Sequence, residues 1–285
     1  MGRRGWYILV VWLLMICGQP VAVRAQSAAN LYYMDFVAQQ ATVNPAFKAP
    51  YDFYFGFPGL SGLNLQLNND AFSWSDIIER GVDDSLRLNI GKAAGRLRSR
   101  NVLGLDVRAD ILRFGFKKGE NYFHLGLSAE VYANAVLTKQ FLSFVLLGPG
   151  QFIGDNYFKH NAIDATAYAS LYFGWSRRVS GMVTVGARAK LIGGLFNLST
   201  KKLGISWDIL NADLSDPTLS PYTYSLKVDG EIRTNMMGKD FSWNGLDFSG
   251  IGKDWGCGFD LGAGVDFAPN WRFTASVLNL GAIFW

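Results

Sequence analysis

Hydrophobic and polar positions alternate with a period of two through much of this chain. The clearest case is residues 122–134, where every second residue from Phe123 to Ala133 is apolar. A period of two places alternate side chains on opposite faces of an extended strand. The apolar face spans roughly 33 Å at about 3.3 Å per residue. That length suits a tilted strand that crosses a bilayer, which needs about 9–11 residues.

The same alternation predicts about ten strands in all. Further strands are expected at residues 51–57, 61–69, 101–116, 165–175, 183–191, 203–209, 222–228, 259–267 and 271–277. The apolar parity switches near Ile111, which predicts a β-bulge there. Tight turns are expected at residues 117–121, 177–181 and 268–270, and they alternate with long connections. These features predict an all-β fold of antiparallel strands.

Three stretches depart from the alternation. Residues 77–80 and 86–97 show helical spacing of their apolar positions and predict short helices in a connecting excursion. Residues 136–150 predict a short helix or a loop, and residues 235–255 a long polar and aromatic loop. No internal repeat or linker divides the chain, so residues 26–285 are expected to form one domain.

The N-terminus has the pattern of a secretory signal peptide. Arg3 and Arg4 precede an apolar core at residues 8–17, and Val23-Arg24-Ala25 places small or medium side chains at the cleavage positions. We expect cleavage after Ala25. The apolar core is short for a membrane helix. Export by this route predicts a protein of the cell envelope.

Composition excludes several classes of function. The net charge of +4 gives no indication of a nucleic-acid partner. Cys17 lies in the expected signal peptide, which leaves Cys257 alone, and His124 and His160 are the only histidines. We therefore expect no disulfide framework, no metal site and no cofactor.

His124, Ser128 and Glu130 share one parity, but residues four apart on a strand lie about 13 Å apart, too far for a nucleophile and its base. No enzyme activity is expected.

Charge within the strands favours a membrane barrel over a secreted β-sandwich, the alternative that alternation leaves open. In a bacterial outer-membrane barrel the periplasmic turns are short, the lipid-facing parity is apolar and the other parity faces the lumen. The charged residues of the polar parity are expected in that lumen: Asp106, Arg108, Asp110, Glu130, Arg188, Lys190, Asp260, Asp266 and Arg272. The visible strands form either a small closed barrel or part of a larger one.

Several short motifs carry a resemblance to known proteins. They are QQATVNPAF at residues 39–47, FGFPGL at 55–60, VGARAKLIGG at 185–194, GFDLGAGVDF at 258–267 and SVLNLGAIFW at 276–285. With the signal peptide, they resemble an uncharacterised family of Bacteroidota outer-membrane barrels and, more distantly, FadL-type fatty-acid transporters and PorV-like barrels of type IX secretion. The resemblance implies that Asn44, Pro45 and Ala46 belong to a plug formed by residues 26–50 inside the barrel.

Two functions follow as expectations. The first is a channel or transporter for small or hydrophobic solutes in the outer membrane of a Gram-negative bacterium. The second is a barrel without transport that acts as a scaffold or as a partner of a secretion system. In both cases the expected partners are outer-membrane lipid and the barrel assembly machinery. Leu127→Asp is expected to impair assembly and Ser128→Asp to be tolerated, because the two residues face opposite sides of one strand.

Overall fold

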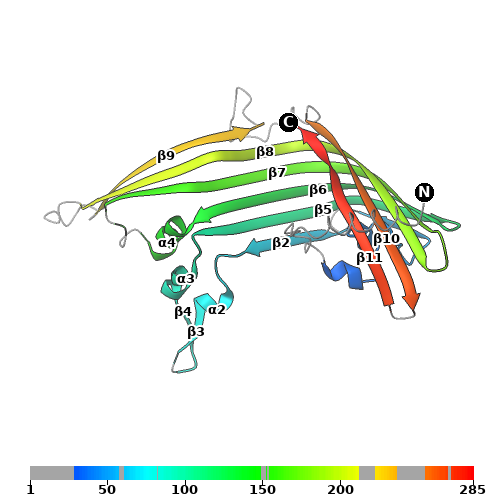
Figure 1. Ribbon diagram of the computed structural model, residues 1–285, viewed down its shortest axis with the longest axis horizontal. Helices are drawn as coiled ribbons and strands as arrows, with labels where there is room; N and C mark the ends of the chain where they lie inside the picture. The colour runs from blue at the N-terminus through cyan, green and yellow to red at the C-terminus, as the bar shows by residue number, and fades with distance from the viewer. Residues whose placement is uncertain are drawn as a thin grey trace, which may run out of the picture.

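The computed structural model describes residues 29–57, 61–81, 83–148, 152, 154–211, 222–235, 254–268 and 271–285. Both the expected signal peptide at residues 1–25 and most of the expected loop at residues 235–255 lie outside these ranges. Over the described residues the fold is an antiparallel β-barrel with few, short helices (Figure 1). This confirms the fold class predicted from the alternation.

Nine strands of the described chain form one sheet. Their bounds are β1 (Phe53–Gly56), β2 (Leu63–Asn69), β5 (Arg100–Lys118), β6 (Asn121–Thr138), β7 (Gly154–Arg178), β8 (Val183–Asn211), β9 (Tyr222–Thr234), β10 (Trp255–Ala268) and β11 (Trp271–Phe284). The order is β1-β5-β6-β7-β8-β10-β11, and every pairing is antiparallel. Both β1 and β2 pair with β5, along successive parts of that strand. In the same way, β10 pairs with the first part of β8 and β9 with the last part.

The tight turns lie at one end of the barrel and the long connections at the other. Gly119 and Glu120 alone separate β5 from β6, and Gly119 has a φ of 60°, a conformation that glycine adopts without steric cost. Residues 179–182 join β7 to β8 at the same end. The opposite end carries α2 (Trp74–Ile77), α3 (Ile90–Arg96) and α4 (Lys139–Leu147), with a separate hairpin of β3 (Ile78–Arg80) and β4 (Leu86–Leu88) (Figure 1).

A small apolar cluster joins α3 to α4. Ala94 on α3 and Leu142 on α4 are buried together with Ala71 and Leu97. The prediction of a helix at residues 77–80 was wrong, since Ile78–Arg80 forms β3 and the helix α2 precedes it. The helix expected at residues 86–97 was right only for Ile90–Arg96, because Leu86–Leu88 pairs with β3.

The sheet distributes its side chains with apolar groups outward and polar groups inward. On β6, Tyr122, His124, Ser128 and Glu130 are buried, whereas Leu125 and Val131 on the other parity are exposed. Leu112, Leu127, Leu171 and Leu191 are successive partners across β5, β6, β7 and β8, so they form a row on the outer face. The bulge expected near Ile111 is confirmed by a register shift between Asp110 and Leu112.

No described helix is long and apolar enough to cross a membrane.

Candidate functional site

The N-terminal segment, residues 29–48, lies inside the barrel at the tight-turn end. It contains two short 3-10 helices, η1 (Ala29–Tyr33) and η2 (Ala38–Thr42). At the barrel end, Lys48 Nζ donates to the carbonyl oxygen of Glu120 at 3.0 Å, and Asp35 pairs with Arg272 at 3.3 Å. Among the described strands β11 pairs only with β10, and β1 and β2 pair only with β5. The segment therefore contacts the edge strand β11 and the turn between β5 and β6.

Asn44 fixes the segment to the inner wall formed by β10 and β11. Its side chain is fully buried, and its Nδ2 donates to the carbonyl oxygens of Ala263 at 3.2 Å and Ala275 at 3.3 Å, two residues paired across these strands. Its Oδ1 accepts from the N–H of Ala46 at 2.9 Å. An asparagine side chain that bonds its own backbone two residues on makes a tight local turn. Pro45 and Ala46 are buried with it.

Two paired glycines make room for this turn. Gly186 on β8 and Gly262 on β10 are register partners. A methyl group on Gly186 would collide with the backbone of Pro45, and one on Gly262 with the side chain of Asn44. Glycine is required where another backbone approaches a strand this closely. Asn44, Pro45, Gly186 and Gly262 therefore form one docking element, which we call the glycine notch.

Further hydrogen bonds tie the segment to both sides of the sheet. Ser276 Oγ on β11 donates to the carbonyl oxygen of Val43 at 2.8 Å. On the opposite side, Arg113 Nη1 donates to the carbonyl oxygen of Ala38 at 3.0 Å, and Gln39 Nε2 donates to that of Ser61 at 2.7 Å. The segment bridges β11 and the strands around β5.

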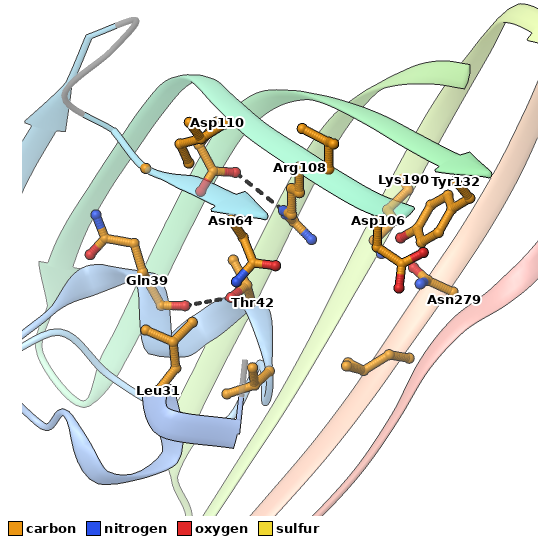
Figure 2. A pocket seen from close by; sticks show the side chains of 15 residues that line it. Leu31, Gln39, Thr42, Asn64, Asp106, Arg108, Asp110, Tyr132, Lys190 and Asn279 are labelled. Carbon is orange, nitrogen blue, oxygen red and sulfur yellow. Dashed lines mark hydrogen bonds and ion pairs between the residues drawn. The ribbon is translucent and has the colours of Figure 1, made fainter. Parts of the chain in front are cut away.

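A cavity of about 200 Å³ lies between the N-terminal segment and the strands. Leu31, Gln39 and Thr42 line it from the segment, and Asn64, Asp106 and Arg108 from β2 and β5 (Figure 2). The remaining wall comes from β6, β8 and β11, and the residues labelled there are Tyr132, Lys190 and Asn279. The lining mixes acids, bases, amides, one aromatic ring and aliphatic side chains.

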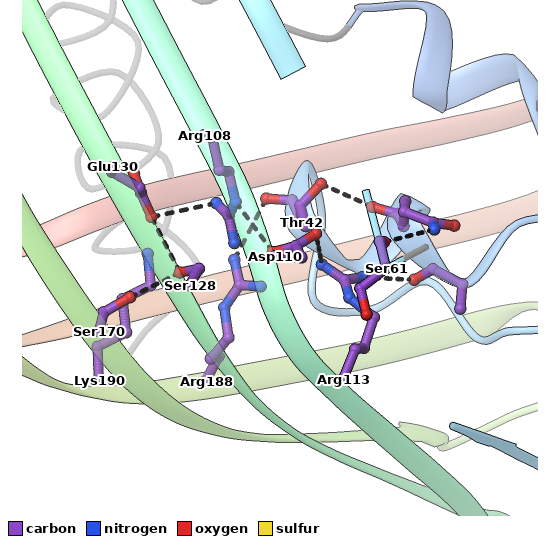
Figure 3. A network of polar contacts seen from close by, with 12 residues as sticks. Thr42, Ser61, Arg108, Asp110, Arg113, Ser128, Glu130, Ser170, Arg188 and Lys190 are labelled. Atoms are coloured by element: carbon purple, nitrogen blue, oxygen red, sulfur yellow. Dashed lines mark hydrogen bonds and ion pairs between the residues drawn. The ribbon is translucent and has the colours of Figure 1, made fainter. Parts of the chain in front are cut away.

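Charged groups inside the barrel form three clusters, of which Arg108 joins the first two (Figure 3). In the first, Glu130 is 1% exposed and accepts hydrogen bonds from the hydroxyls of Tyr132 at 2.7 Å and Tyr168 at 3.0 Å. Arg108 Nη1 lies 3.5 Å from the same carboxylate. A buried charge needs such partners, because desolvation penalises an isolated one.

The second cluster surrounds Asp110, which accepts from Arg113 at 2.6 Å and lies 3.4 Å from Arg108. In the third, Asp260 accepts from Arg188 at 2.5 Å and from Lys190 at 2.9 Å, and its other oxygen accepts from the N–H of Asn279 at 2.7 Å. Arg188 also donates to the carbonyl oxygen of Thr42 at 3.2 Å, which links this cluster to the N-terminal segment.

The nine charged residues predicted to face the lumen separate into three groups. Six belong to the three clusters, and Asp106 lines the cavity and accepts a 3.3 Å hydrogen bond from Asn68. Asp266 and Arg272 lie at the tight-turn end, where they pair at 2.5 Å and remain partly exposed. All nine stand on the parity opposite to the exposed apolar side chains.

Sequence reasoning missed several residues that the structure brings into the site. Arg113 is 3% exposed, and the parity switch at Ile111 places it on the inner face. Tyr132 and Tyr168 stack on each other beside Glu130, with ring centroids 5.9 Å apart. The glycine notch could not be found from the strand pattern, since Gly186 and Gly262 lie 76 positions apart in sequence and 142 or more from Asn44. For the described residues, no cluster of three or more His, Cys, Asp or Glu side chains is arranged to hold a metal.

A curved antiparallel sheet around a buried polar interior defines a β-barrel. Residues 45–285 match the model of a family of unknown function, DUF5723, and the chain belongs to that family. No curated protein and no solved structure matches the chain.

Proposed function

We propose that this protein is an outer-membrane barrel of a Gram-negative bacterium that admits small solutes. One observation carries the proposal: the barrel is apolar outside and charged inside. Leu171 is 49% exposed and Leu191 59% on the outer face, whereas Glu130, Arg188 and Asp260 are at most 2% exposed. A soluble barrel gains free energy from the reverse arrangement, because burial of apolar surface contributes about 25 cal/mol per Å². A hydrocarbon environment favours the arrangement seen here.

The ends of the barrel support an orientation. Outer-membrane barrels have short periplasmic turns and longer extracellular loops. The tight-turn end is then periplasmic, and α2, α3 and α4 lie on the extracellular side. The N-terminal segment contacts the tight-turn end through Lys48 and Asp35. That contact agrees with a chain that arrives from the periplasm and inserts with help from the barrel assembly machinery.

The N-terminal segment acts as the plug in this proposal. Its docking through Asn44, Pro45 and Ala46 agrees with the resemblance to FadL-type transporters. The charged interior favours small polar solutes over hydrophobic ones, because an apolar solute would gain little from contact with ion pairs. The same interior gives no support to a PorV-like role in secretion.

Planar-bilayer conductance of the purified protein tests this function. We expect the wild-type protein to insert and pass a small current, and a variant without residues 29–47 to pass a current several-fold larger. A variant with Gly193→Ala serves as the control, because a methyl group there meets no atom within 4 Å. If the wild-type protein and the variant without residues 29–47 both insert and neither conducts, the channel function is wrong and the scaffold function is favoured.

A further inference from the structure

The cavity beside the N-terminal segment has an unusual pair of charges on its wall. Asp106 is half-buried, and among the described residues no cation lies within ion-pair distance of its carboxylate. On the same wall, Arg108 Nη2 is buried and has no hydrogen-bond partner in the described structure. The Asp106 carboxylate can therefore accept from a further donor, and Arg108 Nη2 can donate to a further acceptor.

The spacing of these two groups is fixed by the strand. Asp106 and Arg108 are two residues apart on β5, so both point to the inner face and their Cα atoms are separated by about 6.6 Å. The Arg108 guanidinium is held on its other side by Asp110 at 3.4 Å and Glu130 at 3.5 Å. Its orientation is therefore set before any ligand arrives, which lowers the entropic cost of binding.

The remaining wall supplies apolar surface and neutral polar groups. Leu31, Val43 and Leu278 line the cavity with apolar side chains. Its volume of about 200 Å³ lies below the range of about 300–1,000 Å³ typical of drug-sized ligands. The cavity therefore suits one small molecule with an apolar part and two opposite charges.

We propose that this cavity binds a free α-amino acid with a small apolar side chain, in its zwitterionic form. The ammonium group pairs with Asp106, the carboxylate accepts from Arg108 Nη2, and the side chain contacts Leu31 and Leu278. The inference rests on the proposed function, because it names the class of solute that the barrel admits. It differs from the expected hydrophobic solute, which would leave the Asp106 carboxylate and Arg108 Nη2 desolvated and without a further partner.

Competing ligands fit the cavity less well. A simple anion at Arg108 would lie beside the carboxylates of Asp106 and Asp110, which repel it. A simple cation at Asp106 would face Arg108 and Lys190. A long-chain fatty acid exceeds the volume. Only a molecule that carries both charges pairs with Asp106 and with Arg108 at once.

Equilibrium dialysis with radiolabelled L-alanine and the purified full chain in detergent micelles tests the inference. We expect saturable binding of L-alanine, with N-acetyl-L-alanine and L-alanine amide each binding about 10- to 100-fold more weakly. Each analogue lacks one charge, and a charge-assisted hydrogen bond contributes about that factor. Glucose and sodium acetate should not compete.

Asp106→Asn provides the matched variant, because an amide keeps the contact with Asn68 and removes only the charge. This variant should bind L-alanine about 10-fold more weakly or worse than the wild type does. Its weak affinity for N-acetyl-L-alanine, which has no ammonium group, should be unchanged. Asp164→Asn is the control, since this exposed carboxylate accepts from Ser199 and does not line the cavity. It should bind L-alanine as the wild type does.

The outcomes separate the inference from the proposed function. Equal affinity for L-alanine and its two analogues, or no saturable binding by wild-type protein, overturns the inference even where Asp106→Asn fails to fold. A barrel that conducts but does not bind L-alanine keeps the channel function and loses this inference. Binding of L-alanine by a protein that does not conduct supports the site and contradicts the channel.

Discussion

Arg188 and Asp260 face each other as register partners on β8 and β10, and Arg188 Nε donates to the Asp260 carboxylate at 2.5 Å with both side chains buried. Lys190 reaches the same carboxylate at 2.9 Å. One acid thus pairs with two bases in the barrel interior. Arg188 also holds the carbonyl oxygen of Thr42, so the pair connects the barrel wall to the N-terminal segment.

Removal of Asp260 should destabilise the barrel more than removal of Arg188. Asp260→Ala leaves two buried cations without their acid, and breaking a buried pair costs about 3–5 kcal/mol. Arg188→Met leaves Asp260 with Lys190 and the N–H of Asn279 as partners. Urea titration in micelles measures the free energy of unfolding. Equal losses, or a larger loss for Arg188→Met, would contradict this reading of the cluster.

The glycine notch should control whether the N-terminal segment docks. Gly186→Ala introduces a methyl group that collides with Pro45, so we expect the segment to leave the wall and conductance to rise several-fold. Gly193→Ala on the same strand is the matched control, with open space around the added methyl group. Unchanged conductance in both variants would show that the segment does not obstruct the lumen.

Asn44 should contribute directly to docking of the segment. Asn44→Ala removes two hydrogen bonds to β10 and β11 and the bond that closes the turn at Ala46. We expect a loss of about 1–3 kcal/mol in the free energy of local opening, given typical values for buried hydrogen bonds. Hydrogen exchange of residues 38–47 measures this opening. The control Asn134→Ala changes an exposed asparagine and should exchange as the wild type does. If Asn44→Ala exchanges at the same rate as the wild type and this control, the docking role of Asn44 is contradicted.

The outer leucine row offers a sharper probe of lipid contact than the pair expected from sequence. Ser128→Asp is a poor control, because Ser128 is fully buried and its hydroxyl lies 3.4 Å from the Glu130 carboxylate. Leu171→Arg places a charge on the outer face and should destabilise assembly by about 2–4 kcal/mol near the bilayer midplane. Thr166→Arg stands on the inner face of the same strand, near Asp164, and should be tolerated. The yield of folded protein in the outer-membrane fraction compares them.

The sequence allowed the barrel to be predicted because the signal is local. Alternation along residues 122–134 fixes which side chains share a face, and the parity switch at Ile111 located the bulge between Asp110 and Leu112. Residues 183–191 and 203–209 were predicted as two strands but belong to one strand, β8. Gly193 and Gly194 interrupt the pattern between them, whereas pairing with β7 carries the strand through.

The site was less predictable because its contacts join distant residues. The inner parity of Arg188 and Asp260 followed from alternation, but the partner of each charge depends on strand register, which the sequence alone did not define. Leu86 and Ile90 have helical spacing, yet Leu86 pairs with Arg80 in a hairpin. Cross-strand hydrogen bonds overrode that local pattern.

Cys257 provides the most direct test of the membrane assignment, because it is an exposed residue of the outer face and the register partner of Leu191. A fluorophore on Cys257, in a chain with Cys17→Ser, should be quenched strongly by brominated lipids after reconstitution into vesicles. The unlabelled thiol should also resist a membrane-impermeant maleimide until the vesicles are dissolved in detergent. An unquenched fluorophore and rapid labelling in intact vesicles would contradict the account, because the apolar outer face would then lie in water.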